Sequence, residues 1–180
     1  MDTLQDDKRF ELAVINPGLV LGPMLRAESG TSVNVVRRLL NREVPASPRI
    51  GFTPVDVRDV AIAHRLAMER PEAAGNRYIC AGDYIWMQDI AKILAGEFNP
   101  QGYKVPTGRL PYWLLWGLAR FDRTVRLALD LVGRRDLVTA EKTERELGWS
   151  MRPVTQSIID TGQSLIEHGV VRRQSSFSPS

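Results

Sequence analysis

The sequence contains one cysteine and two histidines, so residues that often build disulfides, metal centres and nucleophilic sites are nearly absent. A lone cysteine excludes a disulfide within the chain. Cys80 lies in the apolar run Tyr78–Ala81, which favours a small buried side chain over a nucleophile. His64 and His168 both fall in predicted helices with no motif around them. We therefore predict no metal site and no cysteine-based chemistry.

Long hydrophobic runs are also missing. No apolar run reaches 18 residues, and the most hydrophobic segment, Pro111–Ala119, is too short to span a bilayer. The first ten residues are charged and polar, which does not fit a secretory signal. These features predict a cytoplasmic protein without a membrane partner.

A strong excess of one charge is absent as well. The chain has 24 basic and 21 acidic residues, a net charge of +3 and a pI of about 9.3. Its densest group of arginines, between positions 120 and 135, is interleaved with Asp122, Asp130 and Asp136, as on a solvated helix face. Nucleic-acid binding would rest on the pI and these scattered arginines alone, so no nucleic-acid partner is predicted.

The strongest positive signal is the stretch Glu11–Pro23, ELAVINPGLVLGP. Residues 12–16 predict a strand that is buried on both faces, as in a parallel sheet. Ligands bind outside the carboxyl ends of such strands. The Pro-Gly turn that follows leaves backbone atoms open to a flat ring, although an ordinary strand-ending turn explains it too.

Behind this stretch, strands and helices alternate, and the second half is mostly helical, which predicts an α/β fold with a small helical lobe. A second buried strand is predicted over Arg77–Ala81. Asp56 fits a helix N-cap, with Asp59 in the first turn, and we interpret both carboxylates as capping and dipole partners. The helix after Asp56 carries a predicted apolar stripe of Val57, Val60, Ala61, His64 and Met68. The remaining predicted helices cover 31–41, 85–98, 110–132, 139–147 and 154–168.

Five motifs resemble, in their order, the C-terminal half of an extended short-chain dehydrogenase/reductase. The likeness is to the NAD-dependent epimerase/dehydratase family and, more narrowly, to its dihydroflavonol reductase-like group. The motifs, from about Phe10 to Gly169, are NPG with GP at 16–23, FTPVDVRDV at 52–60, RYICA at 77–81, ELGW with RP at 146–153, and the last helix. The resemblance implies the C-terminal part of a Rossmann-type doubly wound parallel sheet plus a mainly helical substrate lobe. Strands 11–16 and 77–81 would belong to the sheet, and 24–55 and 99–153 mainly to the lobe, within a portion covering 1–171.

The resemblance also implies NAD or NADP as cofactor. The backbone of Pro17, Gly18, Leu19 and Val20 would contact the nicotinamide. The substrate would be a small organic ketone, aldehyde or secondary alcohol. The family's glycine-rich phosphate loop is absent from this sequence, and none of its four tyrosines has a lysine four residues on. We therefore expect no catalytic residue in this chain, which we interpret as an enzyme fragment that is inactive alone.

Two alternatives stay open: a non-catalytic binding or assembly module derived from the family, and an epimerase or dehydratase. Strand 12–16 would pair at most with 77–81, which leaves one edge open. We therefore expect the chain to associate with a missing N-terminal half or with itself. The polar segment 172–180 predicts a disordered tail.

Overall fold

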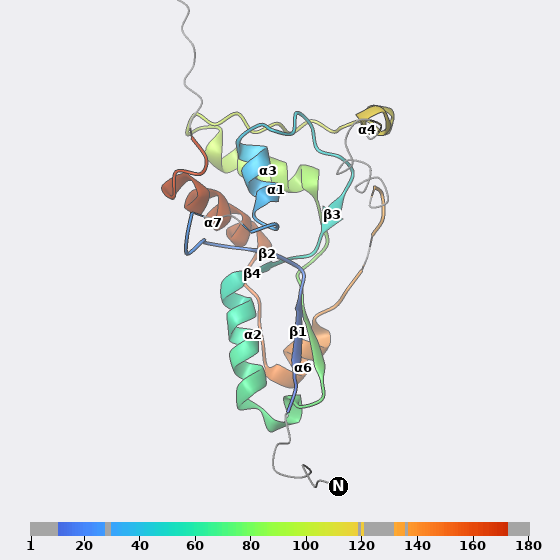
Figure 1. Ribbon diagram of the computed structural model, residues 1–180, viewed down its shortest axis with the longest axis vertical. Helices are drawn as coiled ribbons and strands as arrows, with labels where there is room; N and C mark the ends of the chain where they lie inside the picture. Colours follow the sequence, from blue (N-terminus) through green and yellow to red (C-terminus); the bar gives the residue numbers. More distant parts are fainter. Residues whose placement is uncertain (1–10, 28–29, 119, 121–131, 136, 173–180) are drawn as a thin grey trace, which may run out of the picture.

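The computed structural model describes residues 11–27, 30–118, 120, 132–135 and 137–172. The lower part of the molecule is built around two parallel strands, β1 (Val14–Pro17) and β5 (Arg77–Cys80), paired from Val14 opposite Arg77 to Pro17 opposite Cys80 (Figure 1). The predicted pairing of these two segments is confirmed. Helix α2 (Val57–Glu69), the short 3₁₀ turn η1 (Pro71–Ala73) and helix α6 (Glu141–Leu147) surround the pair.

The prediction that the first strand is buried on both faces is wrong. Ala13 and Ile15 pack into a core cluster with α2, whereas Leu12 is 69% exposed and Val14 is 38% exposed. Successive side chains of a strand point to opposite faces, so only one face of β1 is covered by the described residues. Its apolar outer face and its second edge are open there.

Two further strand pairs follow the Pro-Gly turn. Strand β2 (Leu19–Leu21) pairs in parallel with β4 (Pro54–Asp56), and β3 (Gly51–Phe52) pairs antiparallel with β6 (Ile85–Trp86). The short segment between Gly51 and Asp56 therefore contains two strands that pair with different partners. Its second strand, β4, is buried throughout.

The apolar stripe predicted for α2 is also wrong. The buried residues of α2 are Asp59, Ala63 and Ala67, while Val57 is 40% exposed and Met68 is 80% exposed. The two alanines have little side chain, so the helix can lie close to β1 and β5. Of the larger residues in the predicted stripe, Val60 packs partly buried against this core, whereas Val57, His64 and Met68 are exposed.

A second core fills the upper part of the molecule, where α1 (Asn34–Leu40), α3 (Met87–Phe98) and α7 (Val154–Glu167) pack together (Figure 1). Helices α7 and α3 lie close together at Gly162 of α7, where a Cβ would lie 2.5 Å from the ring of Phe98. Fully buried members of this cluster are Val36, Leu39, Ile90, Leu94, Phe98, Ile158 and Leu165.

Helix α6 packs with the lower core, whose members include Tyr78, Cys80, Leu147 and Trp149. Residues 103–106 form no strand: Tyr103 and Val105 are buried, and the Val105 amide donates to the Asn99 side chain. Helix α4 (Tyr112–Leu118) begins the predicted 110–132 helix, most of whose remainder lies outside the described residues, as does 173–180 of the predicted tail.

Candidate functional site

Gly18 is the point where the chain leaves the β1–β5 pair and joins the β2–β4 pair. Its amide donates to the Cys80 carbonyl at 2.9 Å, and the Leu19 amide donates to the Thr53 carbonyl at 3.0 Å. A Cβ at position 18 would lie 1.9 Å from the Thr53 carbonyl oxygen, closer than any side chain can approach. Glycine is therefore required here by the close approach of two backbones, whatever ligand the turn contacts.

A pocket of about 370 Å³ opens beside this crossing. Gly18 and Leu19 line it, and Pro17 and Val20 do not. Pro17 is exposed, and Val20 packs towards the lower core. The other lining residues are Ser32, Ile50, Gly51, Phe52, Thr53, Tyr84 and Arg134. Two of the four predicted cofactor-contacting residues thus face a pocket of the size that small-molecule sites have.

Tyr84 is the aromatic wall of this pocket, and our interpretation of the sequence missed it. Its ring packs on Gly51, where a Cβ would lie 2.2 Å away, and its hydroxyl donates to the Arg134 carbonyl at 2.8 Å. The guanidinium of Arg135 lies 5.2 Å from the ring centre. Tyr84 lies four residues after Cys80, the last residue of β5, so the rule that ligands bind at carboxyl ends of parallel strands could have identified it.

Trp113 and Trp116 are not core residues, because their exposed fractions are 72% and 54%. Both lie on α4, at the end of the molecule far from α2 (Figure 1). Their helical spacing resembled an amphipathic core helix, but the described part of the chain provides no cover for them.

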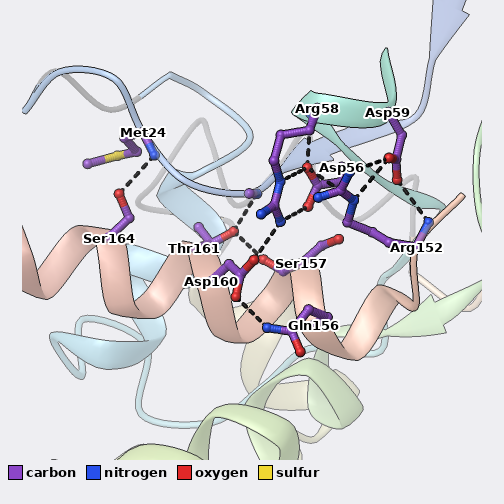
Figure 2. A network of polar contacts seen from close by, with 11 residues as sticks. Met24, Asp56, Arg58, Asp59, Arg152, Gln156, Ser157, Asp160, Thr161 and Ser164 are labelled. Atoms are coloured by element: carbon purple, nitrogen blue, oxygen red, sulfur yellow. Dashed lines mark hydrogen bonds and ion pairs between the residues drawn. The ribbon is translucent and has the colours of Figure 1, made fainter. Parts of the chain in front are cut away.

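A network of ion pairs joins the beginning of α2 to α7 (Figure 2). Asp56 is fully buried, and its carboxylate accepts hydrogen bonds from the backbone amide, Nε and Nη2 of Arg58 at 2.7–2.9 Å. Arg58 also pairs with Asp160 of α7. The predicted N-cap role of Asp56 is confirmed, and Arg58, whose side chain is 38% exposed, joins Asp56 to Asp160.

Asp59 has a different role from the one predicted. Its carboxylate accepts from Nε, Nη2 and the backbone amide of Arg152 at 2.7–2.9 Å, and its carbonyl accepts from the Trp149 indole at 2.8 Å (Figure 2 shows the Arg152 contacts). The VDVRD segment and the ELGW–RP segment, far apart in sequence, therefore bind each other through Asp59. Capping of α2 does not explain this buried carboxylate.

The polar face of α7 holds the chain that follows β2. Thr161 accepts from the Gly22 amide at 2.6 Å and donates to the Ser157 carbonyl at 2.6 Å, while Ser164 accepts from the Met24 amide at 2.8 Å. Gly22 has φ of 116°, a conformation that favours glycine, and a Cβ there would also lie 3.0 Å from the Asp56 carboxylate. These contacts hold the segment between Gly18 and Met24 against the ion-pair network.

From the ion-pair network we predict how the stability of the protein changes at acid pH. Burial alone would raise the pKa of Asp56, but hydrogen bonds from Arg58 and Ser157 and the Arg58 charge hold it below its ordinary value. The Asp56 carboxylate therefore binds a proton more readily in the unfolded chain than in the folded protein. Its contribution to the free energy of unfolding is complete above the unfolded pKa, about 3.9. That contribution is lost as pH falls through the lower folded pKa.

In Asp56→Asn we expect lower stability at pH 7 and a smaller loss of stability on acidification than in the wild type. Urea unfolding at a series of pH values between 7 and 2 measures both. Equal pH dependence in the two proteins would show that Asp56 does not carry this effect.

Cys80 has the buried, unreactive position that the sequence predicts. Its side chain is inaccessible, and burial raises the pKa of its thiol to about 11. Among the described residues, no group of histidine, cysteine or acidic side chains is arranged to hold a metal ion. No helix in that part of the chain is both long and apolar enough to cross a membrane.

Known proteins with a similar sequence or fold indicate the class to which this structure belongs. No family model matches the chain. A putative dihydroflavonol 4-reductase from Synechocystis is 30% identical over 178 residues, which cover 91% of this chain and 51% of that protein. The solved structure of yeast methylglyoxal/isovaleraldehyde reductase Gre2 complexed with NADPH has 26% identity and a TM-score of 0.65, covering 91% of this chain and 45% of that one. A nucleoside-diphosphate-sugar epimerase from Pseudomonas aeruginosa, at 20% identity and a TM-score of 0.68, shares the fold.

The fold is thus the C-terminal part of a Rossmann-type α/β domain with a mainly helical lobe, as the sequence predicted. By sequence and fold, the chain matches the dihydroflavonol reductase-like group of the extended short-chain dehydrogenases/reductases over part of their length. It spans about half the length of the relatives it matches.

Proposed function

We propose that this chain forms the nicotinamide-side wall and the substrate lobe of an NAD(P)-dependent reductase of small ketones, aldehydes or secondary alcohols. The supporting observation is the pocket at Gly18, which opens where β1 ends beside β5. A flat ring can lie against the Gly18–Leu19 backbone where these two residues line the pocket. Tyr84 and Phe52 supply an apolar surface for the substrate.

NADP(H) is the cofactor we favour, since the Gre2 structures with which this chain shares its fold hold NADPH. When bound, the nicotinamide supplies or accepts the hydride. This chain's part is to position the ring and the substrate and to exclude water. The proton for the carbonyl oxygen requires an acid from a Tyr–Lys pair, and this sequence contains no tyrosine with a lysine four residues later.

The division between sheet and lobe remains a proposal. The two core clusters support a lobe centred on α1 and α3, with 24–55 on its side. Helix α6 and Trp149 pack with β5 and α2, so within 99–153 the segment 141–149 fits better on the sheet side. We also retain a cytoplasmic location as a proposal.

The test uses a chimera in which the part of yeast Gre2 preceding the matched region is joined ahead of Glu11. We expect the 180-residue chain alone to leave NADPH unchanged in the presence of isovaleraldehyde or methylglyoxal, and the chimera to oxidise it. The Gre2 part alone is the control. Activity of the isolated chain would contradict the assignment of the acid to another segment. A folded, NADPH-binding chimera without reductase activity would contradict the reductase proposal.

The open side of β1 supports the further proposal that this chain associates with another polypeptide. Leu12, Val14 and Met68 are exposed, and Leu12 and Met68 line one shallow hollow between β1 and α2. An N-terminal half of the same family, or a second copy of this chain, would cover that surface. The chimera assay distinguishes the two functions, because a non-catalytic assembly module would give a chimera that does not oxidise NADPH.

A further inference from the structure

A second pocket, of about 200 Å³, lies next to the Gly18 pocket and shares none of its lining residues. The edge-to-face ring pair of Tyr84 and Trp86, with centres 5.0 Å apart, stands between them: Tyr84 lines the first pocket and Trp86 the second. The lining residues of the second pocket are Ser47, Pro48, Arg49, Trp86, Gln88 and Arg109.

Three chain segments hold this pocket together. The backbones of Ser47 and Arg109 run side by side: the Ser47 amide donates to the Gly108 carbonyl, and the Leu110 amide donates to the Ser47 carbonyl, both at 2.8 Å. The Arg49 guanidinium lies 5.1 Å from the centre of the Trp86 ring. Gln88, in the first turn of α3, donates to the Thr107 carbonyl at 3.0 Å. Each of these three segments is therefore held in place by a contact with another part of the chain.

The pocket is rich in hydrogen-bond donors that lack acceptors. Ser47 is fully buried, and its hydroxyl has no hydrogen-bond partner in the described part of the chain. Arg49 and Arg109 are exposed residues, Arg49 contacts only the Trp86 ring through its guanidinium, and no described carboxylate forms an ion pair with either arginine. A buried hydroxyl without a partner is costly and uncommon in native proteins, so its presence beside two unpaired guanidinium groups indicates a ligand with oxygen acceptors.

The beginning of α3 adds to this positive character. Trp86 is its N-cap residue and makes no side-chain capping bond, and of the first-turn amides that of Met87 already donates to the Ile50 carbonyl at 2.8 Å. The positive end of a helix dipole favours an anion. Asp89, the acidic residue of that turn, accepts from Lys92 at 2.8 Å, so its charge is already paired.

We propose that this pocket is an anion-binding subsite that accepts a phosphate or carboxylate group. Arg49 and Arg109 would supply planar, charged donors to two of its oxygens, and the Ser47 hydroxyl would donate to a third at the bottom of the pocket. With the Gly18 pocket on the other side of the Tyr84–Trp86 pair, the anionic group would be the tail of a substrate whose carbonyl lies near Gly18. That extension rests on the proposed function, whereas anion binding itself does not.

The experiment measures binding of inorganic phosphate to the 180-residue chain by calorimetry, at constant ionic strength and without nucleotide. We expect saturable binding that Arg49→Gln and Arg109→Gln each weaken about tenfold, because each removes a charge-assisted hydrogen bond. Arg145→Gln, an exposed arginine on α6, is the matched control and should leave binding unchanged.

Ser47→Ala separates binding from folding. It removes a buried hydroxyl without a partner, so the urea midpoint should stay the same or rise while phosphate binding weakens. Absence of saturable phosphate binding to the wild type, or equal binding by all four variants, would overturn the proposal. Phenyl phosphate and benzoate then distinguish the ligand: binding of the first alone identifies a phosphoryl site, and binding of both a general oxyanion site. The chimera assay addresses the reductase proposal independently.

Discussion

Gly18→Ala is expected to destabilise this protein by roughly 3 kcal/mol, at the upper end of what overpacking costs. The added methyl group would overlap the Thr53 carbonyl oxygen, which is backbone and accepts the Leu19 amide. The strands β2 and β4 must separate or tilt to admit it. Because Gly18 and Leu19 line the candidate site, the same substitution should distort the wall on which we place the nicotinamide.

Gly96→Ala is the matched control. Gly96 is exposed within α3, and a Cβ there meets no atom within 4 Å. Alanine in a helix interior is favoured over glycine by about 0.5–1 kcal/mol, so this variant should be slightly more stable than the wild type. Urea unfolding followed by circular dichroism measures both variants. A Gly18→Ala protein as stable as Gly96→Ala would show that the crossing of the two backbones is looser than described.

Arg152→Met is the second substitution with a large expected effect. It leaves the Asp59 carboxylate, which is 3% exposed, with only the Arg152 backbone amide as a partner. Removing one member of a buried ion pair typically costs about 3–5 kcal/mol. Domains are stable by only about 5–15 kcal/mol, so a large share of the native stability would be lost.

The partner substitution should be milder. Asp59→Asn leaves the Arg152 side chain without its carboxylate partner, but that side chain is 27% exposed and can be hydrated. The side-chain amide oxygen of the new asparagine can still accept a hydrogen bond from the Arg152 backbone amide. We expect Arg152→Met to cost more than Asp59→Asn, and the double variant to cost less than the sum of the two. Chemical denaturation of the three variants supplies the double-mutant cycle. Additive costs would contradict direct coupling of the two side chains.

Several features of this protein follow from local sequence. The strand at 12–16 and its partner at 77–81 were predictable, because short apolar runs bounded by turn residues are typical of strands in parallel sheets. The Asp56 cap was predictable, since capping depends on a residue and the amides that follow it within one turn. The rule that places ligands at the ends of such strands pointed to residues 17–20, of which Gly18 and Leu19 line the pocket.

Other features depend on which surfaces meet, and local patterns do not determine this. Val57, His64 and Met68 have the spacing of a core stripe, yet α2 buries Ala63 and Ala67 instead, because small residues allow closer packing on the strands. Asp59 and Arg152 form their pair only when the end of the chain folds back onto α2. Tyr84, Ser47 and Arg109 likewise gain their places from contacts between distant segments.

The sequence by itself determined the secondary structure near the site, the capped helix and the family order of motifs, because these depend on neighbouring residues. Only the tertiary structure decided which face of each element is covered, how Gly18 is confined by Thr53, and which charged groups are paired. The physical reason is that burial and ion pairing depend on the distance between segments, and that distance is not written in the spacing of residues along either segment.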